Sequence, residues 1–163
     1  KMILKMNALQ DERMIKKLYE ASQAGVQVQL LVRGICCLVP GVEGMSENIE
    51  VRSIMDRYLE HARVYIFHNN GEEKLYIASA DWMTRNLDRR VEVAFPLLQD
   101  NLIKEVRDII DLQLADDTKT RNVDNTYIKP PSATNLRAQY AIYHYLRDLV
   151  PQKIGPACER GGA

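Results

Sequence analysis

The chain has 163 residues with 22 basic and 22 acidic side chains, so its formal net charge is zero, and 46% of its residues are hydrophobic. These values are ordinary for one soluble globular domain, and the neutral balance gives no reason to expect a nucleic-acid partner. No apolar run approaches the ~20 residues of a membrane span, so no membrane-spanning helix is expected.

The first segments predict a β-α-β unit. Residues 2–6 are expected to form a strand, a helix should run between its cap Asp11 and Gly25, and residues 26–32 read as a buried strand rich in β-branched residues. Strands joined by a helix pair in parallel, so a parallel pair is expected. Arg33 directly follows the second strand, at the edge of an open α/β sheet where ligands bind.

The middle of the chain predicts a helix and then a hairpin. Ser46 can cap a helix that runs to about Leu59, which would put His61 just past its end. Residues 64–67 and 75–78 are apolar runs on either side of a turn-like Asn-Asn-Gly sequence, and they predict two paired strands.

The last third completes one domain. Its predicted elements are, in order, a strand, an amphipathic helix, a long polar connector and a final helix, at residues 91–96, 103–114, 116–134 and 135–149. The whole predicts an α/β fold, a mixed sheet flanked by helices, as a single domain over residues 1–150. Residues 151–163 contain two prolines and a Gly-Gly pair and are expected to be a flexible tail. Since the chain begins inside a predicted strand, we expect it to be a piece of a larger protein.

Polar side chains gather at the ends of the two hairpin strands. His61 precedes the first strand, and a set of polar residues follows the second: Ser79, Asp81, Arg85, Asn86 and Arg90. Arginine supplies the planar paired donors that a phosphoryl group prefers, and histidine changes protonation near neutral pH. The pattern predicts a phosphate site in which His61 serves as proton shuttle or nucleophile and Ser79, Asp81, Arg85 and Asn86 are supporting residues.

Each of these residues also has a purely structural interpretation. His61 can be a surface histidine at a helix end, Arg33 can form a surface ion pair, and Arg85 and Arg90 can belong to a solvated basic face. No zinc-type spacing and no cluster of carboxylates indicates a metal held by the chain, so no metal ligand is predicted.

Two short motifs resemble the His-x-Lys and Ser-x-Asn layout of the phospholipase D superfamily. They are His61-x-Arg63 and Ser79-x-Asp81, at the ends of the predicted adjacent strands. In that superfamily the histidine and the basic residue engage one phosphate. Here Arg63 stands in place of lysine, Asp81 stands in place of asparagine, and the spacing between the motifs is longer.

A longer series of segments resembles the C-terminal catalytic domain of bacterial type-1 polyphosphate kinases. The resemblance covers most of residues 5–149, and its motifs include KMNAL at 5–9, LVRGICCL at 31–38, RYLEH at 57–61, SADWMTRN at 79–86 and RVEV at 90–93. It implies a phospholipase D-like fold.

The resemblance also implies an activity and site roles. The family is a kinase that reversibly transfers the terminal phosphate of ATP to inorganic polyphosphate through a phosphohistidine, in a tunnel between two phospholipase D-like domains. That histidine lies in the preceding domain, which is absent here. By the family's motifs, His61 matches a second essential histidine, and Arg33 and Arg90 match contacts to ATP and phosphate.

The resemblance implies further partners and surroundings. They are Mg²⁺ bound with ATP and largely not held by this chain, the nucleotides ATP and ADP, polyphosphate, and the remaining domains of the enzyme. A homo-oligomer in the full-length protein and a cytoplasmic location, or one peripheral to the membrane, are implied as well.

Two alternatives remain open on the sequence. One is a phosphodiesterase of the phospholipase D superfamily, and the other is a non-catalytic module that binds nucleotide or polyphosphate. The isolated chain is expected to be inactive in phosphoryl transfer, because only one histidine of the catalytic pair is present.

Overall fold

The computed structural model describes residues 1–122 and 134–149. Its strands are β1 Met2–Met6, β2 Val28–Val32, β3 Ile49–Ile54, β4 Arg63–Phe67, β5 Lys74–Ala78, β6 Ala94–Pro96 and β7 Thr120–Arg121. Its helices are α1 Glu12–Gln23, α2 Thr84–Arg89, α3 Asp100–Leu114 and α4 Ala138–Leu149, with a 3-10 turn, η1, at Asn69–Gly71.

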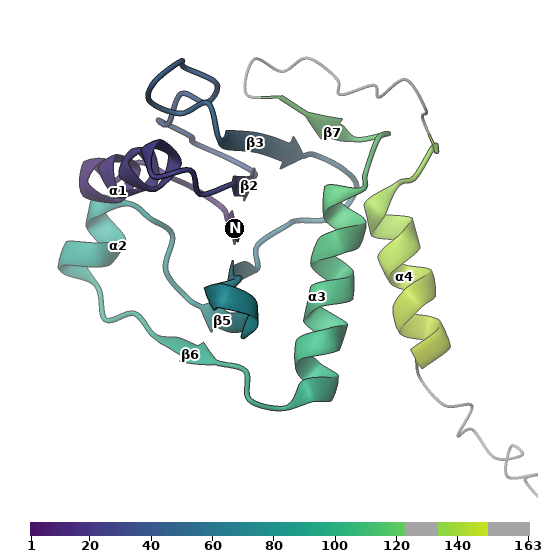
Figure 1. Ribbon diagram of the computed structural model, residues 1–163. Coiled ribbons are helices and arrows are strands. Elements are labelled where there is room, and N and C mark those ends of the chain that lie inside the picture. The colour runs from purple at the N-terminus through teal and green to yellow at the C-terminus, as the bar shows by residue number, and fades with distance from the viewer. Residues whose placement is uncertain (123–133, 150–163) are drawn as a thin grey trace, which may run out of the picture.

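The strands form one mixed sheet in the order β6-β5-β4-β1-β2-β3-β7. Helices α1 and α2 lie on one side of this sheet and α3 and α4 on the other (Figure 1). The result is a three-layer α/β arrangement, as the alternation of predicted strands and helices indicates.

Strand directions bring several chain ends to one edge of the sheet. β1, β2 and β3 are parallel, whereas β4 is antiparallel to β1 and β5 is antiparallel to β4. The last residues of β1, β2, β3 and β5 and the first residue of β4 therefore meet at the same edge, which we call the carboxyl edge. The predicted β-α-β unit and the predicted hairpin are both confirmed.

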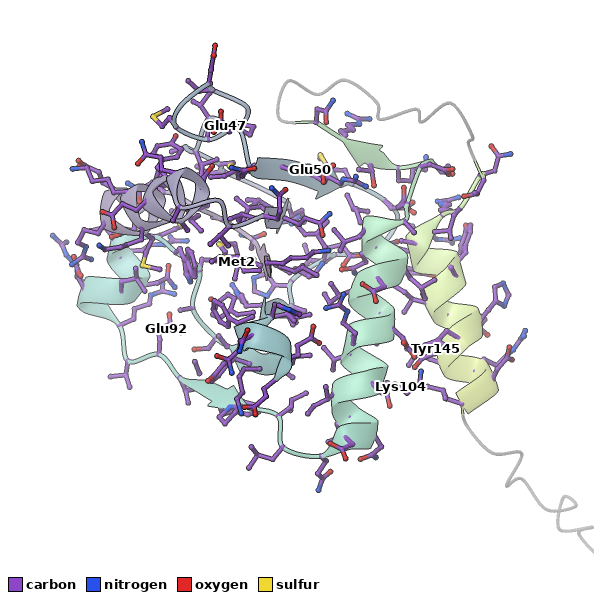
Figure 2. The ribbon with its side chains drawn as sticks, viewed as in Figure 1. Met2, Glu47, Glu50, Glu92, Lys104 and Tyr145 are labelled. Atoms are coloured by element: carbon purple, nitrogen blue, oxygen red, sulfur yellow. The ribbon has the colours of Figure 1, made fainter. Side chains whose placement is uncertain are left out.

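Alternation along the strands divides the core into two layers. In β1, Leu4 and Met6 belong to the cluster that includes Ile15 of α1, while Ile3 belongs to the cluster that includes Ile110 of α3. Successive strand residues face opposite sides of the sheet, so one strand serves both clusters. α4 packs beside α3, where Tyr145 donates a hydrogen bond to Asp108 at 2.7 Å and lies between the two helices (Figure 2).

The helix predicted from Ser46 to Leu59 is wrong, because residues 49–54 form β3 and pair in parallel with β2. Isoleucine and valine suit a half-buried pleated strand, and pairing with β2 overrides the weak helical periodicity. Four apolar residues at helical spacing favour that helix. Of these, Ile54 is buried in β3 at 4% exposure, whereas Met55, Tyr58 and Leu59 are 53%, 60% and 66% exposed. His61 therefore follows a strand and a non-helical segment rather than a helix end.

Several further elements differ from the prediction. α2 and β7 have no predicted counterpart, and β6 covers only three residues of the predicted strand 91–96. Residues 123–133 of the predicted connector and the tail 151–163 lie outside the described residues. Among the helices that are described, none has both the length and the apolar character needed to cross a membrane.

Asp116 ties β7 to the start of α4. Its carboxylate is buried and accepts hydrogen bonds from four backbone N–H groups, those of Thr118, Lys119, Thr120 and Ala138. Removing the acceptor leaves buried donors without partners, so we expect Asp116→Ala to lower the free energy of unfolding by about 1–3 kcal/mol. Denaturant unfolding measures this. The control Asp148→Ala removes an exposed ion pair and should change stability by less than about 0.5 kcal/mol. Equal effects would contradict the prediction.

Candidate active site

One guanidinium at the carboxyl edge joins His61 to Asp81. Arg63 Nε donates to Asp81 Oδ1 at 3.1 Å, and Nη2 donates to Oδ2 at 2.9 Å. The terminal nitrogens Nη1 and Nη2 also lie 3.2 and 3.1 Å from Nδ1 and Nε2 of His61, and Nη1 donates to the His61 carbonyl at 3.0 Å. The structure therefore places His61 and Asp81, both predicted site residues, against the same side chain.

The His61 ring keeps one N–H that Arg63 cannot use. A neutral imidazole has one acceptor nitrogen and one N–H, and a guanidinium has donors only. At most one of the two ring contacts is then a hydrogen bond donated by Arg63. The remaining ring N–H has no acceptor among the described residues, and His61 is exposed. An oxygen-rich anion is a ligand that could supply this acceptor.

Asp81 is a buried anchor rather than a free carboxylate. Its Oδ1 also accepts hydrogen bonds from the backbone N–H groups of Asn7 at 2.8 Å and Ala8 at 3.1 Å, directly after β1. Burial by itself would raise the pKa of Asp81, but the hydrogen bonds from Arg63 and from the two backbone groups outweigh it and hold the pKa below its usual value. Asp81 therefore stays ionised and fixes Arg63 to the end of β1.

Arg33 joins the same set of contacts through Asn7. Its Nε donates to Asn7 Oδ1 at 2.9 Å, so the Asn7 side chain holds Arg33 while its backbone holds Asp81. The Gly34 N–H donates to the Asn7 carbonyl at 2.8 Å, and a Cβ at Gly34 would lie 3.0 Å from that oxygen. Glycine thus lets the segments after β1 and β2 meet closely. Arg33 lines a hollow of about 180 Å³ together with Ser53.

Ser79 and Asn86 bind a carboxylate that was not predicted. Ser79 Oγ donates to Glu92 Oε2, and Asn86 Nδ2 donates to Oε1 at 2.7 Å. Figure 2 labels Glu92 in the segment between α2 and β6. The hydrogen bonds from Ser79 and Asn86, followed by the nearby charge of Arg90, keep the pKa of Glu92 below its usual value. Arg90 itself is exposed.

Glu60, the residue before His61, is held by side chains of both α3 and α4. Glu60 forms an ion pair with Lys5 at 2.9 Å, and its carboxylate also accepts hydrogen bonds from Gln113 at 2.8 Å and Gln139 at 2.9 Å. The two charged side chains are only 6% and 13% exposed, so the pair is largely desolvated. Lys5 of β1, Gln113 of α3 and Gln139 of α4 thereby position the backbone that carries His61.

Arginines without a carboxylate partner share one region of the described chain. Within residues 1–122 and 134–149, five have no ion pair, and all lie in the segments that follow β2, β3 and β5: Arg33, Arg57, Arg85, Arg89 and Arg90. Carboxylates near them are already engaged, as Asp81 and Glu60 show. These segments therefore hold five arginines that no carboxylate contacts among the described residues, which favours a polyanion as their ligand.

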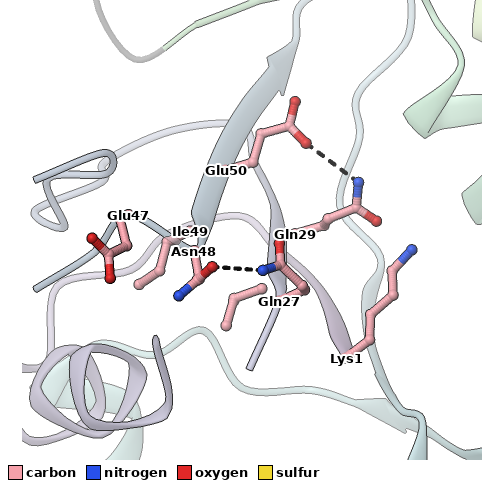
Figure 3. A pocket seen from close by; sticks show the side chains of 8 residues that line it. Lys1, Gln27, Gln29, Glu47, Asn48, Ile49 and Glu50 are labelled. Carbon is pink, nitrogen blue, oxygen red and sulfur yellow. Dashed lines mark hydrogen bonds between the residues drawn. The ribbon is translucent and has the colours of Figure 1, made fainter. Parts of the chain in front are cut away.

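A second hollow lies at the opposite edge of the sheet. It has a volume of about 260 Å³ and is lined by Lys1, Gln27, Gln29, Glu47 and Glu50 among others (Figure 3). Gln27 donates to Asn48, and Gln29 donates to Glu50. Two carboxylates against one lysine give this lining a negative balance, so the smaller hollow beside Arg33 is the better phosphate site.

The described residues do not fit a protein-held Mg²⁺. No group of three or more His, Cys, Asp or Glu in this part of the chain is arranged to hold a metal. The carboxylates of Glu60, Asp81 and Glu92 already accept hydrogen bonds from cations, amides or a hydroxyl. A metal ion would have to displace those donors in order to bind these carboxylates.

The structure thus links some predicted site residues and leaves others apart. His61, Asp81 and Arg33 are joined by direct contacts through Arg63 and Asn7, whereas Ser79 and Asn86 contact Glu92. Arg85 and Arg90 make no hydrogen bond to these groups within the described residues.

Sequence reasoning did not single out Asn7, Glu60 or Glu92. Of these, Asn7 carried a usable signal, because it directly follows a predicted strand at the ligand-binding edge.

Comparison with known proteins gives consistent matches. The family model described as polyphosphate kinase C-terminal domain 2 matches residues 1–139. The polyphosphate kinase of Escherichia coli strain K12 is 52% identical over 150 residues, which are 90% of this chain and 22% of that protein. The polyphosphate kinase of Bacillus anthracis is 58% identical over 127 residues, 77% of this chain and 18% of that protein. The chain spans about a fifth of the length of these relatives.

Solved structures agree with the fold. The crystal structure of polyphosphate kinase from Porphyromonas gingivalis superposes with a TM-score of 0.86 at 48% identity, covering 90% of this chain and 23% of that one. NucT from Helicobacter pylori superposes with a TM-score of 0.56 at 11% identity, covering 69% of this chain and 77% of NucT, and it shows a shared fold only. The predicted phospholipase D-like mixed sheet flanked by helices is confirmed.

Proposed function

This chain belongs to the polyphosphate kinase family, as its C-terminal domain 2, and we propose that it forms one side of an active site that reversibly transfers the terminal phosphate of ATP to inorganic polyphosphate. In this proposal a histidine of the preceding domain of the complete enzyme becomes phosphorylated. The observation that carries the proposal is the direct chain of contacts from Arg33 to His61 at an edge rich in unpaired arginine.

Arg33 is arranged to bind a phosphate through the two terminal NH₂ groups of its guanidinium. Its Nε is bound to Asn7, which orients the guanidinium and leaves both terminal NH₂ groups without an acceptor among the described residues. Paired N–H groups match two oxygens of one phosphate. Phosphoryl transfer passes through a state with charge spread over the oxygens, and fixed guanidinium donors stabilise that charge. Arg90 supplies a second such contact in the proposal.

His61 acts on the group that leaves. The nucleophilic histidine and the leaving oxygen must lie on opposite sides of the transferred phosphorus atom. With the nucleophile in the other domain, His61 lies on the leaving side in this proposal. There its ring donates a hydrogen bond to the departing oxygen or, as an imidazolium, transfers a proton to it and becomes neutral.

The proposal includes the partners that this chemistry needs. ATP, ADP and polyphosphate are the substrates and products. Mg²⁺ bound to the nucleotide would neutralise part of the phosphate charge, and no group of three or more His, Cys, Asp or Glu among the described residues could hold it. The complete enzyme is proposed to be a cytoplasmic homo-oligomer.

We expect the isolated 163-residue chain to show no turnover with Mg-ATP and polyphosphate, because it lacks the nucleophilic histidine. The complete polyphosphate kinase that carries this domain, assayed in parallel, should be active. Robust phosphoryl transfer by the isolated chain would refute the proposal.

A model phosphodiester, added as a second substrate in the same experiment, distinguishes the kinase from the phosphodiesterase alternative. Its hydrolysis by the isolated chain would instead indicate a phosphodiesterase. Polyphosphate binding without turnover in the complete protein would indicate a binding module.

A further inference from the structure

We propose that Arg63 and Asp81 are positioning residues that set the His61 ring, and that Arg63 does not bind the transferred phosphate. This inference rests on the proposed role of His61. It concerns the two places where the chain departs from the His-x-Lys and Ser-x-Asn layout, since Arg63 replaces the lysine and Asp81 the asparagine. The structure pairs these two departures with each other at 2.9 Å, although they are 18 positions apart.

Most of the N–H donors of Arg63 are already hydrogen-bonded within the site. A guanidinium has five N–H groups. Two of them bind the Asp81 carboxylate, one binds the His61 carbonyl, and of the two that lie beside the His61 ring nitrogens at most one donates a hydrogen bond to the ring. The Arg63 side chain is only 13% exposed, compared with exposed Arg85, Arg89 and Arg90. A phosphate would have to break existing hydrogen bonds to reach Arg63, whereas the terminal NH₂ groups of Arg33 have no acceptor in the described part of the chain.

Asp81 holds Arg63 in place and balances its charge. Its Oδ1 is tied to the backbone after β1 by Asn7 and Ala8, so the carboxylate cannot follow a moving guanidinium. A lysine at position 63 would keep the positive charge beside Asp81, but a single ammonium lacks the planar fork that touches Asp81 and both ring nitrogens at once. Arg63→Lys therefore removes the positioning contact while keeping the charge pair.

Arg63→Lys in the complete enzyme should lower kcat by about 100-fold, as expected when a catalytic group is displaced by about 1 Å, and leave the KM for ATP within about threefold. Asp81→Asn keeps an acceptor for the backbone N–H groups but frees the guanidinium. It should also lower kcat, with an unchanged or lower KM for ATP, because the released Arg63 can now attract phosphate. A raised KM with unchanged kcat in Arg63→Lys would overturn the proposal, since it is the result for a phosphate ligand.

The decisive measurement is the same substitution in a His61→Gln background. A residue that acts through His61 has little left to affect there, so adding Arg63→Lys should change kcat by less than about threefold. A further loss of about 100-fold would mean that Arg63 acts on the substrate directly, and it too would overturn the proposal.

Two controls make the outcomes distinguishable. Arg107→Lys alters another part-buried guanidinium, which lies on α3 and pairs with Glu73 and Asp111, and it should leave kcat unchanged. If His61→Gln alone runs at the wild-type rate, the proposed role of His61 fails. If His61→Gln is slow while Arg63→Lys and Asp81→Asn are both normal, only the positioning role fails. Should Asp81→Asn not fold, the result for the less buried Arg63→Lys decides.

Discussion

Replacing His61 with glutamine in the complete enzyme should lower turnover by about 100- to 10,000-fold, the range typical for loss of a positioned proton donor. Glutamine keeps a hydrogen-bond donor at the site but cannot exchange protons near neutral pH. ATP binding should change little, because Arg33 and Arg90 remain, and the phosphohistidine on the other domain should still form. Steady-state rates and radiolabel retained on the enzyme measure the two effects separately.

The control for His61→Gln is His144→Gln, which changes an exposed histidine on α4 that packs edge-on against Tyr143. It should retain the wild-type rate. If His61→Gln matches this control, His61 is a surface residue without a catalytic role. If the label disappears in His61→Gln and the wild-type enzyme carries phosphate on His61 itself, the roles of the two histidines are reversed.

Replacing Arg33 with glutamine should weaken the binding of ATP and polyphosphate by about 10- to 100-fold, because hydrogen bonds to charged groups contribute about 1.5–3 kcal/mol each. The loss should be larger at low salt than at high salt, since much of the attraction is between charges. Arg33→Lys restores the charge without the fork and should recover only part of the affinity. Equilibrium binding of ATP at two salt concentrations tests this.

Arg147→Gln is the matched control for Arg33→Gln. Arg147 lies on α4, is 57% exposed and pairs with Asp148, so the same chemical change should leave binding unaffected. Equal binding by both variants would show that charge at position 33 does not contact the ligand. A loss that is independent of salt would indicate that Arg33 supports the local structure rather than the phosphate.

Local sequence patterns were sufficient to predict many of the helices and strands. The β-branched run at residues 26–32, the helix between Asp11 and Gly25, and the two apolar runs around Asn-Asn-Gly each predict an element that the structure contains. The helix predicted over residues 49–54 was wrong because their apolar spacing fits a helix as well as a strand. Pairing with the parallel strand β2 decides between the two.

The sequence by itself predicted a phosphate site and the edge of the sheet where it would lie, because residue type dictates which ligands a side chain can bind and strand ends dictate where it emerges. His61, Arg33 and Asp81 could be singled out in this way. Only the tertiary structure decided which polar groups are free and which are already bound. Arg63 meets Asp81, Ser79 and Asn86 meet Glu92, and Lys5 meets Glu60 55 positions later. A buried charge must find a partner, and that partner is set by packing across the sheet, which no local periodicity records.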